Sequence, residues 1–289
     1  MFFPTVFNDI RGQNCPSKAT HLTMPFSQES LNSQAWCSLL HQIRLHYGSN
    51  IGDNDYQFLE RIYRDGLHKY LDRLKSIGFC GNQRILDAGC GYGQWSLALA
   101  QLNEMVLSCD ISPLRVSVLQ KLATQIGFTN IASEVSGIDI MTYPDQHFDA
   151  VFCYGVIFLT PWRQSLAELA RVLKPGGKLY VNANGLGWYM FLWQEEHNKA
   201  DDYDPKAIAA QTFLDTLRYD RDGVYKQGMN LIIEPKSIET ELQRLGFQDI
   251  KLAAEGALHL NKAVTSPRPF FKGEYYGQPG IFEATGTKR

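Results

Sequence analysis

Hydrophobic and polar positions follow two different rhythms along this chain, and the rhythm predicts its elements. Between residues 84 and 185, short apolar runs alternate with segments in which apolar residues recur every three or four positions. Short apolar runs bounded by turn residues predict buried strands, whereas the longer spacing predicts amphipathic helices. Repeated strand–helix units predict an α/β fold built on a doubly wound, mostly parallel sheet.

End signals place the elements of this region. Ser112 is a favourable N-cap, Pro113 suits the first helical position, and Gly127 suits a helix end. A later helix begins at Trp162 and is stopped by Pro175 and the glycines after it. The predicted strands are residues 84–88, 104–110, 130–136, 148–156 and 178–185.

The N-terminal flank has a different character. Residues 1–27 show little periodicity and are predicted to form an irregular arm. Helices are predicted near 28–47 and 54–77, and Gly78 is a suitable stop for the second.

The C-terminal flank begins with a break in the alternation. Residues 186–232 are aromatic, acidic and partly helical, without a clear strand pattern. A helix at 235–247 and strands at 248–255 and 279–288 follow. Because no helix separates these two strands, they are predicted to pair antiparallel.

Composition narrows the classes of partner and compartment. The 289-residue chain has 28 basic and 30 acidic residues, so no strong field favours a nucleic acid partner. No apolar run is long enough to span a bilayer, and the N-terminus lacks the basic leader of a secretory signal. Cys109 and Cys153 lie in apolar runs, and no cysteine or histidine spacing indicates a metal site. We expect a cytoplasmic protein without metal, and its oligomeric state is left open.

The glycine-rich segment LDAGCGYG carries the first chemical signal. Gly89, Gly91 and Gly93 stand between a predicted strand and a predicted helix, where a chain turns sharply and approaches a ligand closely. Asp87, at the end of the strand, would repel a pyrophosphate but suits a ligand with positive charge. Asp110 ends the next strand, where a carboxylate accepts hydrogen bonds from ribose hydroxyls. A ribose, no phosphate and a positive charge together describe S-adenosylmethionine.

Four segments resemble the successive motifs of class I S-adenosylmethionine-dependent methyltransferases. They are LDAGCGYG, CDIS, FDAVFCYGV and RVLKPGGKLYV, and the resemblance is strong over about residues 80–185. It implies a Rossmann-like sheet of seven strands, mostly parallel with one antiparallel edge strand, and release of S-adenosylhomocysteine. The implied parts are an N-terminal arm with cap helices (1–79), a cofactor-binding core (80–185), a lid or substrate insertion (186–232) and a closing helix and hairpin (233–289).

The resemblance also implies further cofactor contacts. Cys90 lies in the glycine loop, Ile111 follows Asp110, and Tyr154 follows the fourth strand. The family often has an acid after the third strand, but Gly137 stands there in this chain. Ile138 and Asp139 are the substitutes that we predict for adenine contacts. Arg64 or Arg61, on a helix that would cover the cofactor, could hold its carboxylate, or could simply lie on a solvated helix face.

Acceptor recognition is predicted in the insertion. Trp188, Tyr189 and Trp193, together with Phe158 after the fourth strand, are candidate pocket residues. A helix buried by its aromatics is the alternative. His197 is the candidate general base. Its competitors are Glu195, Glu196, His259, Glu274 and Tyr276.

The resulting hypothesis is methyl transfer to a small polar acceptor, favouring O-methylation of a sugar-like or secondary-metabolite hydroxyl. N-methylation of an amine metabolite, a macromolecular acceptor and a non-catalytic S-adenosylmethionine-binding protein are the alternatives.

Overall fold

The computed structural model describes residues 33–200, 203–265 and 269–289. The predicted N-terminal arm, residues 1–27, lies outside these ranges. Nine α-helices and nine strands are present in the described residues, and two of the strands form a small separate hairpin. No helix in this part of the chain is long and apolar enough to cross a membrane.

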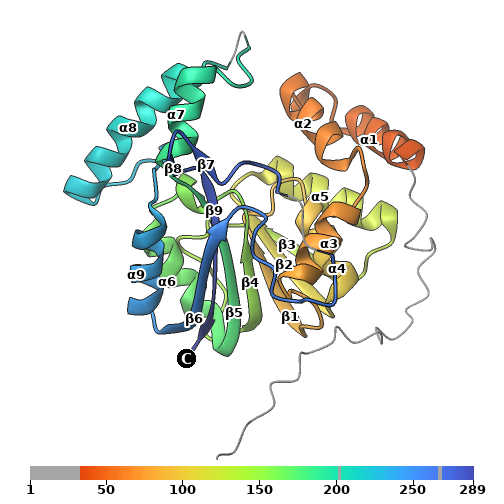
Figure 1. Ribbon diagram of the computed structural model, residues 1–289. Helices are drawn as coiled ribbons and strands as arrows, with labels where there is room; N and C mark the ends of the chain where they lie inside the picture. The colour runs from red at the N-terminus through yellow and green to blue at the C-terminus, as the bar shows by residue number, and fades with distance from the viewer. Residues whose placement is uncertain (1–32, 201–202, 266–268) are drawn as a thin grey trace, which may run out of the picture.

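A central sheet organises the described residues (Figure 1). Its strands are β1 (Arg84–Ala88), β2 (Met105–Asp110), β3 (Ile131–Val135), β4 (Phe148–Cys153), β5 (Leu173–Asn184), β6 (Phe247–Ala254) and β9 (Ile281–Lys288). Their order is β3-β2-β1-β4-β5-β9-β6. Neighbours among β1–β5 are parallel, whereas β9 is antiparallel to β5 and β6. The predicted seven-stranded, mostly parallel sheet is confirmed, and its reversed strand lies one place in from the edge strand β6.

Helices cover both faces of the sheet. They are α1 (Ser33–Tyr47), α2 (Asp53–Tyr63), α3 (His68–Ser76), α4 (Gln94–Leu102), α5 (Pro113–Ile126), α6 (Trp162–Val172), α7 (Leu186–Glu195), α8 (Pro205–Asp222) and α9 (Pro235–Arg244). Alternate residues of a strand point to opposite faces. Ile85 and Phe152 therefore share a core with α3, α4 and α5, whereas Leu86 and Val151 share one with α6 and α9.

Local signals explain where several elements start and stop. Ser112 Oγ accepts the backbone N–H of Arg115 at 3.3 Å, Pro113 opens α5, and Gly127 ends it with a φ of 91°. The helix predicted at 54–77 is instead two helices, α2 and α3. The chain turns between them at Gly66, whose φ of 67° is left-handed.

Helices α7 and α8 project above the sheet beside a small hairpin (Figure 1). The hairpin consists of β7 (Glu274–Tyr275) and β8 (Gln278–Pro279). A Cβ added at Gly187 in α7 would lie 2.4 Å from the carbonyl oxygen of Gln278, so only glycine permits this close packing. The contact fixes α7 against the hairpin just beyond the end of β5.

Candidate cofactor and acceptor site

The glycine loop connects β1 to α4 through left-handed backbone. Gly89, Gly91 and Gly93 have φ values of 81°, 54° and 90°. A Cβ at Gly89 would lie 2.3 Å from Val156 Cγ2, and one at Gly93 would lie 2.3 Å from Leu119 Cδ1. A Cβ at Gly91 would meet nothing within 4 Å. The outer glycines are thus required by packing, and the middle one borders open space.

Asp110 holds this loop from the end of β2. Its Oδ2 accepts the N–H of Gly91 at 3.0 Å, and its Oδ1 accepts the N–H of Ser112 at 2.9 Å. A carboxylate offers about four acceptor positions, so both oxygens retain capacity for another donor. This arrangement suits paired hydroxyl groups such as those of a ribose.

Asp87 lies beneath the loop at the end of β1. The carboxylate is 1% exposed and accepts the Ser96 hydroxyl at 2.6 Å. Burial raises the pKa of Asp87 to about 7, against the lowering by Ser96 and with a further rise from Asp110. A positive charge brought near Asp87 would favour its ionised form.

Residues after β2 and β3 meet beside Asp110. The N–H of Ser136 donates to the backbone carbonyl of Asp110 at 3.1 Å. Ile111 is 61% exposed, and a Cβ at Gly137 would lie 3.8 Å from it and 2.6 Å from Asp139 Oδ1. Ile138, by contrast, is 3% exposed and belongs to the core. An apolar surface and a carboxylate therefore flank Asp110, while contacts to adenine remain a prediction.

Helix α2 packs over the glycine loop. The hydroxyl of Tyr63 donates to the carbonyl oxygen of Tyr92 at 2.8 Å, and the rings of Phe58 and Tyr92 lie 6.2 Å apart. Arg61 lies over Phe58, 5.2 Å from its ring centre, and Arg64 is exposed at the end of α2. The helix is thus placed to cover a ligand, and the proposed carboxylate contact of Arg64 stays a prediction.

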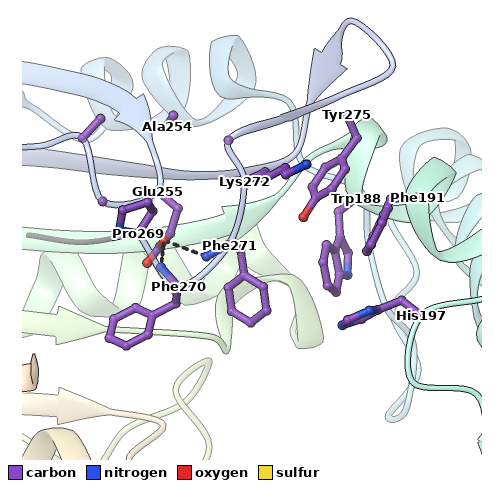
Figure 2. A pocket seen from close by; sticks show the side chains of 13 residues that line it. Trp188, Phe191, His197, Ala254, Glu255, Pro269, Phe270, Phe271, Lys272 and Tyr275 are labelled. Carbon is purple, nitrogen blue, oxygen red and sulfur yellow. Dashed lines mark hydrogen bonds between the residues drawn. The ribbon is translucent and has the colours of Figure 1, made fainter. Parts of the chain in front are cut away.

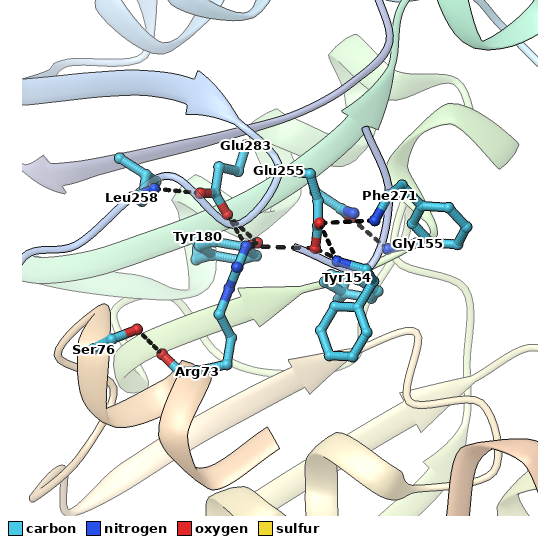
Figure 3. Close-up of polar contacts among 11 residues, drawn as sticks. Arg73, Ser76, Tyr154, Gly155, Tyr180, Glu255, Leu258, Phe271 and Glu283 are labelled. Carbon is cyan, nitrogen blue, oxygen red and sulfur yellow. Dashed lines mark hydrogen bonds and ion pairs between the residues drawn. The ribbon is translucent and has the colours of Figure 1, made fainter. Parts of the chain in front are cut away.

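Tyr154 connects the end of β4 to a second part of the site (Figure 3). Its hydroxyl donates to Glu255 Oε1 at 3.2 Å. Glu255 Oε2 accepts the backbone N–H groups of Phe270 and Phe271 at 2.6 and 3.2 Å. One buried carboxylate therefore ties the 269–275 loop to the strand that ends beside the glycine loop.

Arg73 of α3 provides the positive charge of this buried network. Its Nη2 lies 3.5 Å from Glu255 Oε1 and pairs more closely with Glu283. Tyr180 donates to Glu283 at 2.8 Å. Burial opposes the charge of Arg73, but Tyr180 and Glu283 outweigh it and raise the pKa of the guanidinium. Burial raises the pKa of Glu283, and Arg73 lowers it.

Glu255 also lines a cavity of about 680 Å³ (Figure 2). Its lining comes from α7 and the turn after it, from residues 254–257 and from residues 269–275. Phe191 stacks on Tyr275 with ring centres 4.3 Å apart, and Trp188 meets Phe271 at 5.4 Å. His197 lies 5.2 Å from Phe191. Because Trp188 and Phe191 are three residues apart on α7, they share one helix face.

The predicted acceptor residues fall in different places. Trp188 and His197 line the cavity. Tyr189 is buried on another face of α7, in a core with Leu192. Trp193 is 47% exposed and borders a separate groove of about 590 Å³ between α7 and α8. Phe158 packs against the α6–α9 core.

The competing bases do not line the cavity. Glu195 accepts the Tyr276 hydroxyl at 2.5 Å, and Glu196 pairs with Lys206 at 2.7 Å. His259 contacts the carbonyl oxygen of Val264 at 3.0 Å, and Glu274 is an exposed residue of β7. No group of three or more His, Cys, Asp or Glu side chains in the described ranges is placed to hold a metal ion.

Sequence reasoning did not find Glu255, Phe271, Lys272 or Tyr275. The available signal was the Phe270–Phe271 pair, two large apolar residues in a loop rich in proline, glycine and charge. Large apolar side chains in a loop usually pack against another surface. Here both rings line the cavity, and Phe270 also packs against the core. Nothing in the sequence connects it to Glu255, which stands 15 residues from Phe270 and 16 from Phe271.

Comparison with known proteins identifies relatives of this chain. A family model described as a methyltransferase domain matches residues 85–177, which include the glycine loop and Asp110. Residues 85–177 form a methyltransferase domain. The ubiquinone biosynthesis O-methyltransferase of Coxiella burnetii is 31% identical to this chain over 112 residues. That alignment covers 38% of this chain and 47% of the relative, so the chain spans about half the length of the curated relative it matches.

Two solved structures share the fold of most of this chain. Geranyl diphosphate methyltransferase in complex with S-adenosylmethionine is 13% identical, with 82% of this chain and 92% of that chain covered and a TM-score of 0.54. The [4+2]-cyclase SpnF is 17% identical, with 81% and 82% covered and a TM-score of 0.50. At these identities the likeness shows the fold alone, which is that of the class I methyltransferases. Because one of these folds belongs to a cyclase, activity must be argued from the site.

Proposed function

We propose that the protein is an S-adenosylmethionine-dependent methyltransferase that methylates a hydroxyl group of a small acceptor bound in the aromatic cavity. The single observation that carries this proposal is the hydrogen-bonded link between the glycine-loop region and the aromatic cavity. Tyr154 follows β4 beside the glycine loop, and its hydroxyl reaches Glu255 on the cavity wall. The methyltransferase domain match and the O-methyltransferase relative support the same activity.

The residues present fit S-adenosylmethionine. Open space above Gly91 admits a ligand close to the backbone, and Asp110 keeps acceptor capacity for ribose hydroxyls. Ile111 offers an exposed apolar surface beside Asp110. Asp87 supplies a buried carboxyl that ionises more readily next to a cation. When bound, S-adenosylmethionine supplies a methyl group that its sulfonium already activates for transfer.

The protein's own task is then mainly to align the acceptor. The aromatic walls hold a ring in the cavity, and orientation of the reacting atoms accounts for much of the rate in such a displacement. When the acceptor oxygen gains the methyl group, it must lose its proton. His197 is the imidazole on the cavity wall, so we propose that it accepts this proton.

Incubation with methyl-labelled S-adenosylmethionine and a fractionated cell extract tests the proposal. We expect label in the small-metabolite fraction, in an acid-stable ether. Asp110→Ala should weaken cofactor binding by about 1–3 kcal/mol, because a buried acceptor is lost. His197→Asn should slow transfer and leave cofactor affinity intact, whereas the matched control His147→Asn should change neither.

Other results would overturn specific parts of the proposal. Label on nitrogen would replace O-methylation with N-methylation, and label in nucleic acid, protein or glycan would replace the small acceptor. Purified phenols are added to the extract as further acceptors. If the protein binds the cofactor but neither these phenols nor any fraction takes up label, a methyltransferase role for hydroxyl acceptors is contradicted.

A further inference from the structure

We infer that the cavity selects an aromatic hydroxy compound carrying a negative charge, and that Lys272 determines this selectivity. The inference rests on the proposed function, because it names the substrate class of the same pocket. It stands on the shape of the cavity walls and on a balance of charges around them.

The walls are suited to a flat ring. Trp188, Phe191, Phe271 and Tyr275 all line the cavity. Phe191 and Tyr275 lie nearly parallel, at 25°, while Trp188 meets Phe271 at 73°. Stacked and edge-on rings together offer both kinds of surface that an aromatic ligand uses.

Among the described residues, Lys272 is the one lysine or arginine that lines this cavity. Figure 2 shows it extending from the loop toward Tyr275. No carboxylate of the described residues lies within ion-pair distance of it. The cavity carboxylate Glu255 is engaged elsewhere: it accepts two backbone N–H groups and the Tyr154 hydroxyl, and it lies 3.5 Å from Arg73. The lysine therefore presents to the cavity an ammonium group that forms no ion pair with a carboxylate of the described residues.

This charge separates two kinds of acceptor. A set of aromatic faces alone would attract a cation as well as a neutral ring. The ammonium of Lys272 repels a second cation and attracts an anionic oxygen group, so it opposes a protonated amine and favours a carboxylate or phosphate. A charged group in a mostly apolar pocket fixes the orientation of the ligand.

Three probes with one ring and different charges test the inference. They are 4-hydroxyphenylacetate, its methyl ester and tyramine, measured by titration calorimetry on the full chain with S-adenosylhomocysteine present. We expect the acid to bind about tenfold more tightly than the ester, and tyramine to bind most weakly. Because Lys272 is an exposed residue, added salt should reduce the preference.

Variants assign the preference to Lys272. Lys272→Met should bring the acid and the ester to equal affinity, and Lys272→Arg should keep the acid preferred. Lys251→Met, an exposed lysine of the edge strand β6, is the matched control and should behave as the unmodified protein. The inference is overturned if the ester binds as well as the acid, if tyramine binds best, if the acid does not bind, or if Lys272→Met retains the preference. These are binding results, so a failure of methyl transfer with the acid preference intact would overturn only the proposed function.

Discussion

The cofactor side and the acceptor side of this site are assembled in opposite ways. Gly89, Gly91 and Asp110 lie within two consecutive strand–turn units, and the backbone N–H of Gly91 donates to the Asp110 carboxylate. The cavity draws on residues 188–197, 254–257 and 269–275, which meet only when the sheet is complete. A site built from neighbouring turns can be predicted from spacing, whereas a site built from distant loops depends on what holds those loops in place.

The forces that hold the two sides also differ. On the cofactor side, left-handed glycines allow the turn, and Asp110 accepts two backbone N–H groups. On the acceptor side, the 269–275 loop is fixed by Glu255, which shares the guanidinium of Arg73 with Glu283. The acceptor side therefore depends on a buried ionic network, in which loss of Arg73 would leave two buried carboxylates without their cation.

Removal of Glu255 should produce the largest effect. Glu255→Ala leaves the N–H groups of Phe270 and Phe271 without their acceptor and removes a counter-charge of Arg73. We expect the free energy of unfolding to fall by about 2–5 kcal/mol, because two backbone N–H groups lose their acceptor, while Arg73 keeps its closer partner Glu283. Urea denaturation followed by tryptophan fluorescence measures it.

The control for this variant lies in the same loop. Glu274→Ala changes an exposed carboxylate of β7 and should alter the unfolding free energy by less than about 0.5 kcal/mol. Equal losses in the two variants would show that the buried network does not hold the loop. Glu255→Gln, which keeps one acceptor oxygen, should lie between them.

Two glycine variants sharpen the comparison from the cofactor side. Both Gly89→Ala and Gly91→Ala force a side chain into left-handed backbone, which costs about 1–2 kcal/mol. Only Gly89→Ala also drives a Cβ into Val156, adding about 1–3 kcal/mol of overpacking. Thermal unfolding should therefore show a larger loss for Gly89→Ala, and a difference within error would mean that the loop relaxes around Val156.

Cofactor affinity separates the glycine variants further. Gly91 borders open space, so a methyl group there would project to where we propose that the ligand lies. We expect Gly91→Ala to weaken S-adenosylmethionine binding more than its effect on stability suggests. Calorimetric titration of both variants tests this, and unchanged affinity would place the ligand away from Gly91.

The same contrast explains what the sequence could predict. The α/β class, the antiparallel pairing of the last two strands, the α5 caps and the positions of Asp87 and Asp110 follow from local patterns, and the structure confirms the fold. The split between α2 and α3 was missed because the apolar spacing continues across Gly66. The cavity was seen only through Trp188 and His197, since hydrogen bonds between residues as distant as Tyr154 and Glu255 leave no periodic trace.

The aromatic segment 188–193 shows the limit within a single helix. Trp188, Tyr189 and Trp193 were all candidates for one pocket, but successive helix residues are about 100° apart and face different surroundings. Trp188 faces the cavity, Tyr189 the α7–α8 core and Trp193 a separate groove. Aromatic content predicted a binding region, and the packing of α7, which includes the close approach of Gly187 to Gln278, sets which face becomes the cavity wall.

The smallest expected effect is a proton released when the cofactor side is filled. The pKa of Asp87 is raised to about 7 in the ligand-free protein, so at pH 7 about half of the molecules carry its proton. A cationic ligand favours the ionised carboxylate and lowers this pKa. S-adenosylmethionine affinity should therefore rise from pH 6 to pH 8, by no more than about tenfold per pH unit below the pKa. Because the folded-state pKa is above the ordinary value of 3.8, ionisation of Asp87 should also reduce fold stability as the pH rises from about 4 to about 7.

Calorimetry in two buffers of different ionisation enthalpy counts the released proton directly. At pH 7 the binding heats should differ in proportion to about half a proton. Asp87→Asn should bring the two heats together and flatten the decline of stability with pH, because the amide does not titrate. Equal heats for the unmodified protein would mean that Asp87 keeps one protonation state on binding. In that case the carboxyl serves the fold through Ser96, and the positive charge of the ligand is met elsewhere on the cofactor side.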